Sequence, residues 1–263
     1  MAGSISRGTS VIRLYDGNNV MLRAFHYDGV QLPGQTAMTH RQRFESQTAA
    51  DIWVWDGRDH NDRRREIYPP YKMNRTPKPE DAYAQVRLWR EVLRYTPATQ
   101  IEVHGWEADD VIGTLVRQNP GKFRVHTNDM DYGQVASMCV LEGVNLKGVP
   151  PHRVCLYKAL VGDASDNISG IPGFGPGRWL EMEPHWDEIQ AAIVAGRPEA
   201  FVGLPFKPKV LAWLTNEENV KLLQAMLTVT HFQNVPEDEL NGGITVGTPN
   251  KSAGRARLAE FFL

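Results

Sequence analysis

The stretch Asp51-Ile-Trp-Val-Trp-Asp-Gly57 is a short apolar run that ends in an acid followed by glycine. The same pattern occurs earlier, in Ser10-Val-Ile-Arg-Leu-Tyr-Asp16 before Gly17. Two strands that each present a carboxylate at the same end are typical of a parallel α/β sheet, in which ligands bind beyond the carboxyl ends of the strands. Either aspartate alone would indicate only a turn, because Asp before Gly is a common turn former.

Other segments fit the same sheet. Gln100-Ile-Glu-Val-His104 and Lys122-Phe-Arg-Val-His-Thr127 are short apolar runs, and Val135 to Leu141 allows another strand. Residues 28–39 contain Gly, Pro and Thr and are expected to form a loop. Apolar residues with helical spacing predict helices over residues 20–25, 41–50, 79–93, 151–161 and much of the chain after Arg178. The sequence therefore predicts an α/β fold with a mostly parallel sheet and a helical C-terminal part.

The composition is that of an ordinary globular protein. The chain has 263 residues, a net charge of −2 and 41% hydrophobic residues, which is enough to bury a sizeable core. No apolar run approaches the roughly 18 residues of a membrane span, and residues 1–10 lack the apolar core of a secretory signal. Cys139 and Cys155 lie in apolar sequence without metal-binding spacing, which favours a reducing compartment. We therefore expect a cytoplasmic protein without membrane contact.

The stretch His104-Gly-Trp-Glu-Ala-Asp-Asp-Val-Ile112 carries a first acidic cluster. Glu107, Asp109 and Asp110 come just before an apolar run with helical spacing. In a first helical turn, such acids can simply cap exposed backbone N–H groups, so the stretch alone fits capping as well as a site. If the acids of this chain gather at one metal site, the remaining surface is net positive and suits a phosphate backbone.

Two further acidic pairs occur later in the chain. Asp129 and Asp131 follow a predicted strand and would point the same way if strand geometry persisted. Asp163 and Asp166 are three residues apart and would share one face of a helical turn. Each pair alone is a weak signal, but together with the strand-end aspartates they predict a cleft lined by carboxylates.

Residues 58–79 form a basic, aromatic segment without apolar periodicity. A solvated loop of this length is unusual in a compact domain, and long loops are usually functional or disordered. Cations beside aromatic rings suit phosphate contact and base stacking on single-stranded nucleic acid. A later loop, Gly170-Ile-Pro-Gly-Phe-Gly-Pro-Gly177, lets backbone amides approach a phosphate, although such a turn is also an ordinary connector. The cations and rings of the basic segment are Arg63, Arg64, Arg65, Lys72, Arg75, Lys78, Tyr68 and Tyr71.

These motifs, in this order and spacing, resemble the 5′–3′ exonuclease/flap endonuclease family. That family includes the nuclease domain of bacterial DNA polymerase I and free-standing bacteriophage enzymes; no polymerase domain follows here, so the chain is more similar to the free-standing members. The resemblance implies a PIN-like 5′-nuclease fold, with a mostly parallel sheet, a helical arch and a C-terminal helix–hairpin–helix region. It implies an α/β nuclease domain at 1–162 with the arch segment at 57–80, packed as one body with a helical region at 163–263.

The resemblance also implies two or more divalent metal ions, Mg²⁺ or Mn²⁺, in two subsites. One subsite would use Asp56, Glu107, Asp109, Asp110 and Asp129, and the other Asp129, Asp131, Asp163 and Asp166. So many carboxylates in one cleft would repel each other strongly unless cations neutralised them. The full set of implied metal ligands is Asp16, Asp56, Glu107, Asp109, Asp110, Asp129, Asp131, Asp163 and Asp166.

The resemblance also implies roles for basic and aromatic residues of this sequence. Lys72 and Arg75 match a catalytic pair that steers the scissile phosphate. The hairpin would grip duplex DNA through backbone amides, with a K⁺ ion as a further expectation. The implied DNA-binding residues are Arg23, Arg64, Tyr71, Gly173, Gly175, Gly177 and Arg178.

The chain departs from the family pattern at three places. The interval from Asp56 to Arg64 has one extra residue, so Arg63 could take the phosphate-contacting role. Pro176-Gly-Arg178-Trp179 stands where a Lys is usual, and Arg178 could replace that Lys. Residues 24–50 are shorter than in polymerase-linked members.

The expected function is a structure-specific 5′ nuclease that acts as 5′–3′ exonuclease and 5′-flap endonuclease. Its partners would be DNA with a 5′ flap or 5′ end and RNA–DNA hybrids, in replication, repair or primer removal. We expect a monomer, in the host cytoplasm if the gene is a phage gene. The alternative is a non-catalytic junction-binding protein on the same scaffold. A haloacid-type phosphatase would need an acid two residues after Asp16, where the chain has Asn18.

Overall fold

A six-stranded sheet forms the centre of the protein, which we describe from a computed structural model covering residues 11–28 and 33–262. The strand order is β5-β4-β1-β2-β3-β6, and every neighbouring pair is parallel except β3 and β6. The prediction of a mostly parallel sheet is confirmed. The strands are β1 (Ile12–Asp16), β2 (Asp51–Trp55), β3 (Thr99–Glu102), β4 (Phe123–His126), β5 (Val140–Glu142) and β6 (Ile244–Val246).

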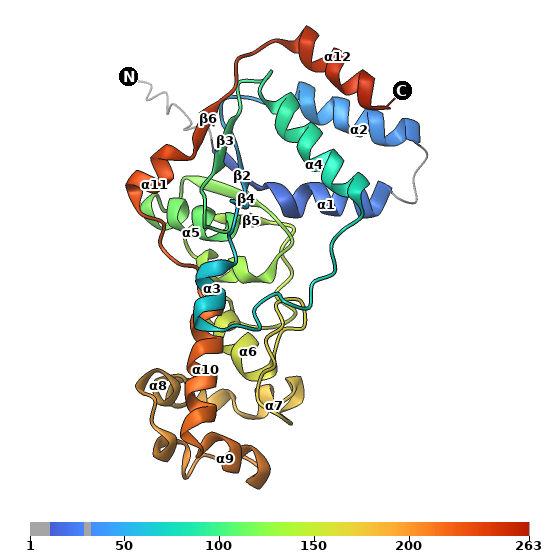
Figure 1. Ribbon diagram of the computed structural model, residues 1–263. Helices are drawn as coiled ribbons and strands as arrows, with labels where there is room; N and C mark the ends of the chain where they lie inside the picture. The colour runs from blue at the N-terminus through green and yellow to red at the C-terminus, as the bar shows by residue number, and fades with distance from the viewer. Residues whose placement is uncertain (1–10, 29–32, 263) are drawn as a thin grey trace, which may run out of the picture.

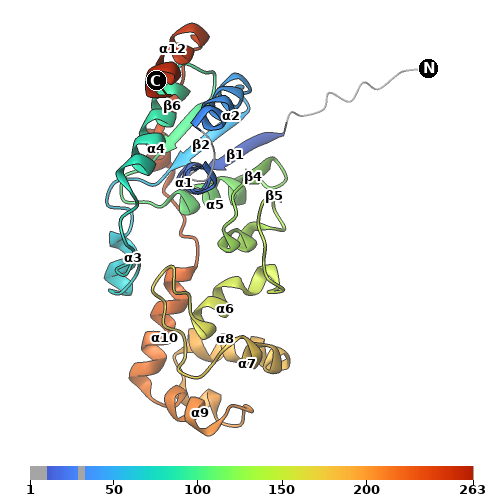
Figure 2. The same cartoon turned by 90° about the vertical axis from the view of Figure 1, so that its right-hand side faces the viewer.

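Helices cover both faces of this sheet (Figures 1 and 2). One face packs against an aromatic core around Trp53, Trp55 and Trp89. The other face packs against the core of Val111, Ile112 and Tyr132. The first face carries α1 (Gly17–Asp28), α2 (Pro33–Glu45), α4 (Glu80–Leu93) and α12 (Lys251–Phe262); the second carries α5 (Ala108–Gln118), the 3₁₀ helix η1 (Met130–Val135) and α11 (Glu237–Gly242).

A helical part with its own core lies at the opposite end of the molecule from α12 (Figure 1). Its long central helix is α10 (Glu217–Thr230). After α10 the chain returns to the sheet, because Phe232 joins the core under α5 and β6 pairs with β3. In the structure the helical part therefore runs from Pro151 to Thr230, where a region at 163–263 was expected. The other helices here are η2 (Pro151–Arg153), α6 (Val154–Val161), α7 (Pro176–Glu181), η3 (Glu183–His185), α8 (Trp186–Ala195), η4 (Pro198–Phe201) and α9 (Pro208–Leu214).

The basic segment forms α3 (Asp62–Ile67) followed by turns, and α3 lies beside α10. Tyr68 and Tyr71 are buried in the core of the helical part, with 4% and 2% of their surface exposed. The segment is therefore anchored at this point. The chain from 75 to 79 then runs without helix or strand to the start of α4.

Several local predictions were wrong. The loop expected over 28–39 is mostly helix, because α2 begins at Pro33; residues 29–32 lie outside the described part of the chain. The helix expected over 41–50 ends at Glu45. Residues 129–131 are not strand, because the Asp129 side chain accepts a hydrogen bond from the Asp131 amide and begins η1. None of the helices in the described ranges combines the length and apolar character of a membrane span.

Candidate metal centre

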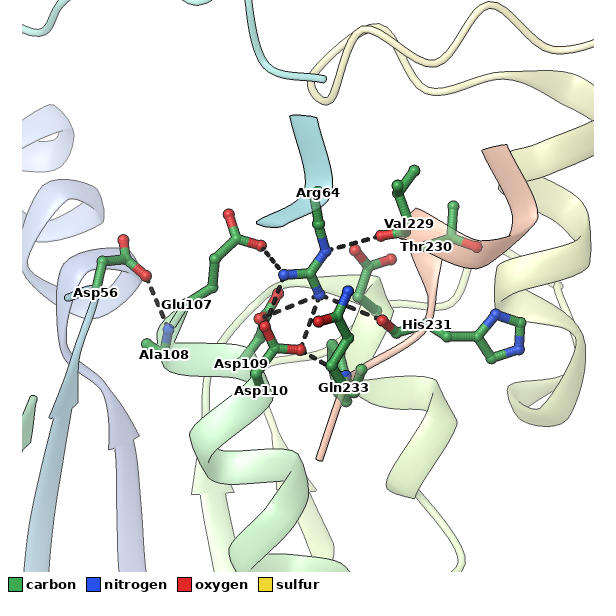
Figure 3. Close-up of polar contacts among 12 residues, drawn as sticks. Asp56, Arg64, Glu107, Ala108, Asp109, Asp110, Val229, Thr230, His231 and Gln233 are labelled. Carbon is green, nitrogen blue, oxygen red and sulfur yellow. Dashed lines mark hydrogen bonds and ion pairs between the residues drawn. The ribbon is translucent and has the colours of Figure 1, made fainter. Parts of the chain in front are cut away.

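The carboxyl ends of β1 and β2 present the first two acids. Asp16 is the last residue of β1, and Asp56 directly follows β2. The Asp56 Oδ1 atom accepts a 2.9 Å hydrogen bond from the Ala108 amide, the first amide of α5 (Figure 3). Glu107 stands at the N-cap position of that helix but makes no capping hydrogen bond. The capping interpretation of Glu107 was therefore wrong: a strand-end aspartate caps the helix, and Glu107 is left for other contacts.

The acids at the start of α5 surround the guanidinium of Arg64, as Figure 3 shows. Oxygens of Glu107, Asp109 and Asp110 lie within 4.8 Å of one another. Arg64 from α3 reaches them with an ion pair of 2.7 Å to Glu107 and hydrogen bonds of 2.7 and 2.8 Å to Asp110. Its Nε donates to the Val229 carbonyl at 2.9 Å. Only 3% of Arg64 is exposed, so this residue is an internal counter-ion.

This pairing separates the pKa values of neighbouring carboxyl groups. Burial by itself would raise the pKa of Glu107, but the cations of Lys72 and Arg64 outweigh it and lower that pKa to about 2. Burial and the charges of Glu107 and Asp110 raise the pKa of Asp109 well above its ordinary value. Its Oδ1 atom is buried and has no hydrogen-bond partner. A cation supplied from solution would satisfy this oxygen.

A second acid group surrounds a lysine that the sequence did not reveal as a site residue. Lys158 on α6 is 4% exposed, and its ammonium contacts Asp131, lies 2.6 Å from Asp163 and 3.9 Å from Asp166. The signal available in the sequence was one lysine inside the apolar helix Val154–Val161. Burial would raise the pKa of Asp163, but Lys158 outweighs it and lowers that pKa to about 2.

The expected helical turn at Asp163 and Asp166 is instead a tight loop. The backbone of Asp163 pairs with that of Ile168 through two hydrogen bonds of 2.8 Å, so the residues between them bulge outward. Both carboxylates nevertheless point to the same side, because each lies within ion-pair distance of Lys158. The loop is further held by Ser165, whose hydroxyl donates to Asp163 at 2.6 Å.

Lys72 and Arg75 connect the two acid groups. The Lys72 ammonium contacts Glu107 and lies 4.0 Å from Asp166 Oδ1. Arg75 donates to the same oxygen of Asp166 at 2.8 Å. Lys72 has a φ of 54°, a left-handed backbone that is unfavourable for a non-glycine residue, and its amide donates to the Asp166 carbonyl at 3.0 Å. The structure therefore holds this pair tightly at the border of both groups.

Three carboxylates remain without a cationic partner within ion-pair distance among the described residues. Burial, followed by repulsion from Asp56 and Asp129, raises the pKa of Asp16 to about 7. Hydrogen bonds fix its oxygens, with Tyr132 donating at 3.2 Å and the Asn19 amide at 3.2 Å. An all-oxygen donor set of this kind fits a hard divalent cation. The three residues are Asp16, Asp56 and Asp129; Asp109 has only a long contact of 3.9 Å to Arg64, and its Oδ1 atom makes no hydrogen bond.

Several predicted DNA-binding residues are not exposed beside these acids. The Tyr71 hydroxyl donates to Glu107 at 3.0 Å and its ring is buried. The ring is therefore not accessible for the predicted stacking on a base. Arg64 is equally unavailable to a phosphate, whereas the Arg63 side chain is 47% exposed. Arg23 is half-buried on α1 near Gly143, where the chain has no room for a Cβ atom.

The predicted hairpin residues lie in the helical part, around α7 (Figure 1). Gly173 has a φ of 81°, and a Cβ on Gly173, Gly175 or Gly177 would meet nothing within 4 Å, so this turn is open. Arg178 is engaged within the chain: it pairs with Glu181 and donates to the Pro205 carbonyl at 2.7 Å.

The metal-free protein is expected to lose stability as the pH rises from about 4 to 8. Asp16 and Asp131 have pKa values of about 7 in the folded chain against 3.8 ordinarily, mainly because of burial. Between these values the folded state binds more protons than the unfolded state, so raising the pH favours unfolding. Melting temperatures in EDTA at pH 5 and pH 8 test this, with a shift of about 2–4 °C for each kcal/mol.

An Asp16→Asn variant should flatten that pH dependence, because the amide does not ionise. A wild-type melting temperature that stays constant or rises over this range would contradict the expectation. Glu107 and Asp163 act in the opposite sense at lower pH. Their pKa values of about 2 contribute stability above their ordinary pKa, and this stability is lost as the pH falls toward 2.

Comparison with known proteins shows the family of this chain. Residues 11–154 match the family model described as the 5′-3′ exonuclease, N-terminal resolvase-like domain. DNA polymerase I of Thermus filiformis is 29% identical over 202 residues, which are 68% of this chain and 24% of that protein. A 5′-3′ exonuclease of Mycoplasma pneumoniae is 31% identical over 147 residues, 48% of this chain and 50% of that protein. The chain thus spans about a quarter of the polymerase relative's length.

Solved structures share the fold. The 5′-exonuclease of phage T5 with bound zinc superposes with a TM-score of 0.60 at 17% identity, covering 96% of this chain and 99% of that one. A T5 flap endonuclease complex with DNA and metal ions gives a TM-score of 0.54, also at 17% identity, covering 94% and 98%. Because the family model matches more than half of its residues, the chain belongs to the 5′–3′ exonuclease family.

Proposed function

We propose that this chain is a metal-dependent, structure-specific 5′ nuclease that hydrolyses phosphodiester bonds at junctions of single-stranded and duplex DNA. The observation that carries the proposal is the division of the carboxylates. Asp16, Asp56 and Asp129 lack cationic partners among the described residues, and Asp109 has only a 3.9 Å contact to Arg64, whereas their neighbours are neutralised by Arg64, Lys72 and Lys158. Membership of the exonuclease family and the metal-bound T5 structures support this proposal.

The proposed metal ions are Mg²⁺ or Mn²⁺, because every available ligand is a carboxylate oxygen. Asp56, Asp109 and Asp129 would hold one ion, with Asp16 close by. Asp129, Asp131, Asp163 and Asp166 would hold another, in competition with Lys158. Glu107 and Asp110 are less available than the family resemblance implies, since Arg64 already pairs with both. A divalent ion in such a site lowers the pKa of bound water and stabilises charge on a phosphate.

Lys72 and Arg75 would bind the scissile phosphate. Both cations lie between the two acid groups, and each already contacts a carboxylate oxygen. The oxygens of a phosphate entering this position would replace Glu107 and Asp166 as the partners of Lys72 and Arg75. Fixed cations at that point stabilise the negative charge that develops on the phosphate oxygens during hydrolysis.

The proposed substrate is DNA with a 5′ end or a 5′ flap, and RNA–DNA hybrids are included in the proposal. The open turn at Gly173–Gly177 would offer backbone amides to the duplex, with K⁺ as an additional ligand of that turn. Arg23 would contact a phosphate near the end of β5. We propose that the chain acts as a monomer, with the α/β part and the helical part forming one working unit.

The direct test is cleavage of a labelled 5′-flap duplex in the presence of Mg²⁺, compared with a blunt duplex and a single strand. Release of products at the junction, and its loss in EDTA, is the expected result. Binding of the flap duplex without cleavage in Mg²⁺ and in Mn²⁺ would contradict the enzymatic assignment and would favour the non-catalytic junction-binding alternative.

A Lys72→Ala variant is expected to lose turnover by roughly 10²–10³-fold, the range for removing one group that stabilises transition-state charge. Binding of the flap duplex should be retained, because other contacts hold the DNA. Single-turnover cleavage and equilibrium binding measure the two effects separately. Lys78→Ala is the matched control, since Lys78 lies in the same segment, is exposed and has no ion pair in the described structure. Equal turnover in both variants would refute this role of Lys72.

A further inference from the structure

A cavity of about 350 Å³ lies beside the second acid group, the one around Lys158. One wall is the turn that carries Asn145 and Lys147, and the other is the loop Gly162–Ser165. The cavity shares Asp129 and Lys158 with the candidate metal centre, so a ligand in it would touch that centre. Ligand pockets usually measure roughly 300–1,000 Å³, which places this one at the size of a single small molecule.

Besides the carboxylates of Asp129 and Asp163, three side chains of this cavity offer unpaired hydrogen-bond donors. Lys147 is exposed and has no carboxylate partner among the described residues, unlike Lys158. Asn145 accepts a 2.9 Å hydrogen bond from the Lys147 amide through Oδ1, which leaves its NH₂ group without a partner in the described structure. The side-chain amide of Asn128 is exposed and equally unpaired. Three free donors beside a candidate metal centre favour a ligand rich in negatively charged oxygen.

The cavity also has a rigid aromatic wall. Tyr157 lines it and packs edge-on against Trp179, with ring centroids 5.2 Å apart and an angle of 87° between the rings. Met130 adds apolar surface beside it. An aromatic ring fixed in this way is a suitable surface for a sugar or a base, because every nucleobase has a flat face that can stack. Donors at one side and apolar surface at another fit a nucleotide better than inorganic phosphate.

We propose that this cavity binds one nucleotide of the strand being cut, next to the phosphodiester that is hydrolysed. Its phosphate lies at Lys147 and the Asn145 amide, and its nucleoside lies against Tyr157. The proposal rests on the proposed nuclease function, since only a nucleic-acid substrate at Asp129 and Asp163 brings a nucleotide to this place. The size of the cavity accommodates one nucleotide, so a released mononucleotide should bind there and compete with the substrate.

The test is a calorimetric titration of the full chain with thymidine 5′-monophosphate (dTMP) in Mg²⁺; dTMP has no internucleotide bond to cleave. We expect Lys147→Ala to weaken dTMP binding about tenfold, as expected for one lost charge-assisted hydrogen bond. Asn145→Asp is the sharper variant. It keeps the oxygen that accepts from the Lys147 amide and therefore the turn, but it replaces the free NH₂ with a negative charge. It should weaken binding at least tenfold.

Controls separate the phosphate contact from a general effect. Lys122→Ala should bind dTMP like the wild type, because Lys122 is exposed at the start of β4, at the opposite end of that strand from Asp129. Thymidine without phosphate should bind equally to wild type and to Lys147→Ala. Inorganic phosphate should bind more weakly than dTMP, because it lacks the part that contacts Tyr157.

Equal dTMP affinity in the wild type, Lys147→Ala and Asn145→Asp would overturn the proposal, as would absence of dTMP binding to a wild-type chain that cleaves flaps normally. Flap cleavage measured in parallel keeps the two proposals apart. A chain that cleaves flaps but ignores dTMP retains the nuclease function and loses this site. A chain that cleaves nothing loses the nuclease function and with it the cut strand as the ligand, and Lys147-dependent dTMP binding would then support only nucleotide binding in the cavity.

Discussion

An Asp129→Asn variant is expected to lose flap cleavage by roughly three orders of magnitude, since a catalytic metal ion contributes several kcal/mol of transition-state stabilisation. Asp129 has no cationic partner among the described residues, yet it belongs to both proposed metal positions. Asp129 also caps η1, and Asn is chosen because it can keep that hydrogen bond. Asn keeps an oxygen for the hydrogen bond of 2.9 Å from the Asp131 amide, so η1 can still begin, and only the charge is removed.

A readout that does not depend on activity accompanies this test. Divalent ions stabilise a protein that binds them in the folded state, so Mg²⁺ or Mn²⁺ should raise the wild-type melting temperature and raise that of Asp129→Asn much less. Asp81→Asn is the control, because Asp81 is exposed in the first turn of α4. Full cleavage together with a wild-type metal effect on melting in Asp129→Asn would remove Asp129 from the site.

The strand-end acids could be predicted because chain direction alone places them. Parallel strands end at the same edge of a sheet, so apolar runs ending at Asp16 and Asp56 are sufficient to bring those carboxylates together. Asp129 was placed correctly next to β4 for the same reason. Its local geometry was wrong, because the hydrogen bond between its side chain and the Asp131 amide begins a 3₁₀ helix where strand alternation was expected.

The pairing of cations with acids could not be predicted, because it depends on contacts between distant segments. Arg63, Arg64 and Arg65 are adjacent, and only the rotation of α3 against α10 decides that Arg64 is buried while Arg63 is exposed. Lys158 similarly looked like a polar residue in an apolar helix. Its role became visible only when the fold brought Asp131 and Asp163 to its ammonium.

Removal of the Arg64 side chain is expected to have the largest effect on stability. Breaking a buried ion pair by deleting one partner costs about 3–5 kcal/mol, because the remaining charge is left uncompensated. In Arg64→Ala, Glu107 and Asp110 lose their ion pairs with the guanidinium. The Val229 carbonyl loses its hydrogen-bond donor. At about 2–4 °C for each kcal/mol, the melting temperature of the metal-free protein should fall by roughly 10 °C.

Arg63→Ala provides the matched control for this variant. The Arg63 side chain lies over the ring of Trp106 at 4.1 Å and 3.6 Å from Glu239, but it is 47% exposed. Exposed contacts of this kind contribute about 0–1 kcal/mol, so its melting temperature should change little. If Arg64 were instead the phosphate contact that the family resemblance implies, Arg64→Ala would weaken DNA binding and leave the stability of the free protein unchanged.

Divalent ions distinguish the two roles further. Without Arg64, Asp110 carries uncompensated charge, Glu107 keeps only Lys72, and Asp109, whose Oδ1 atom makes no hydrogen bond, loses its 3.9 Å contact to the guanidinium. Mg²⁺ or Mn²⁺ should therefore raise the melting temperature of Arg64→Ala more than that of the wild type, because the added ion replaces the missing guanidinium charge. A smaller metal effect in Arg64→Ala than in the wild type would show that Arg64 supports the metal site by shaping it, and that its charge does not compete with the ion.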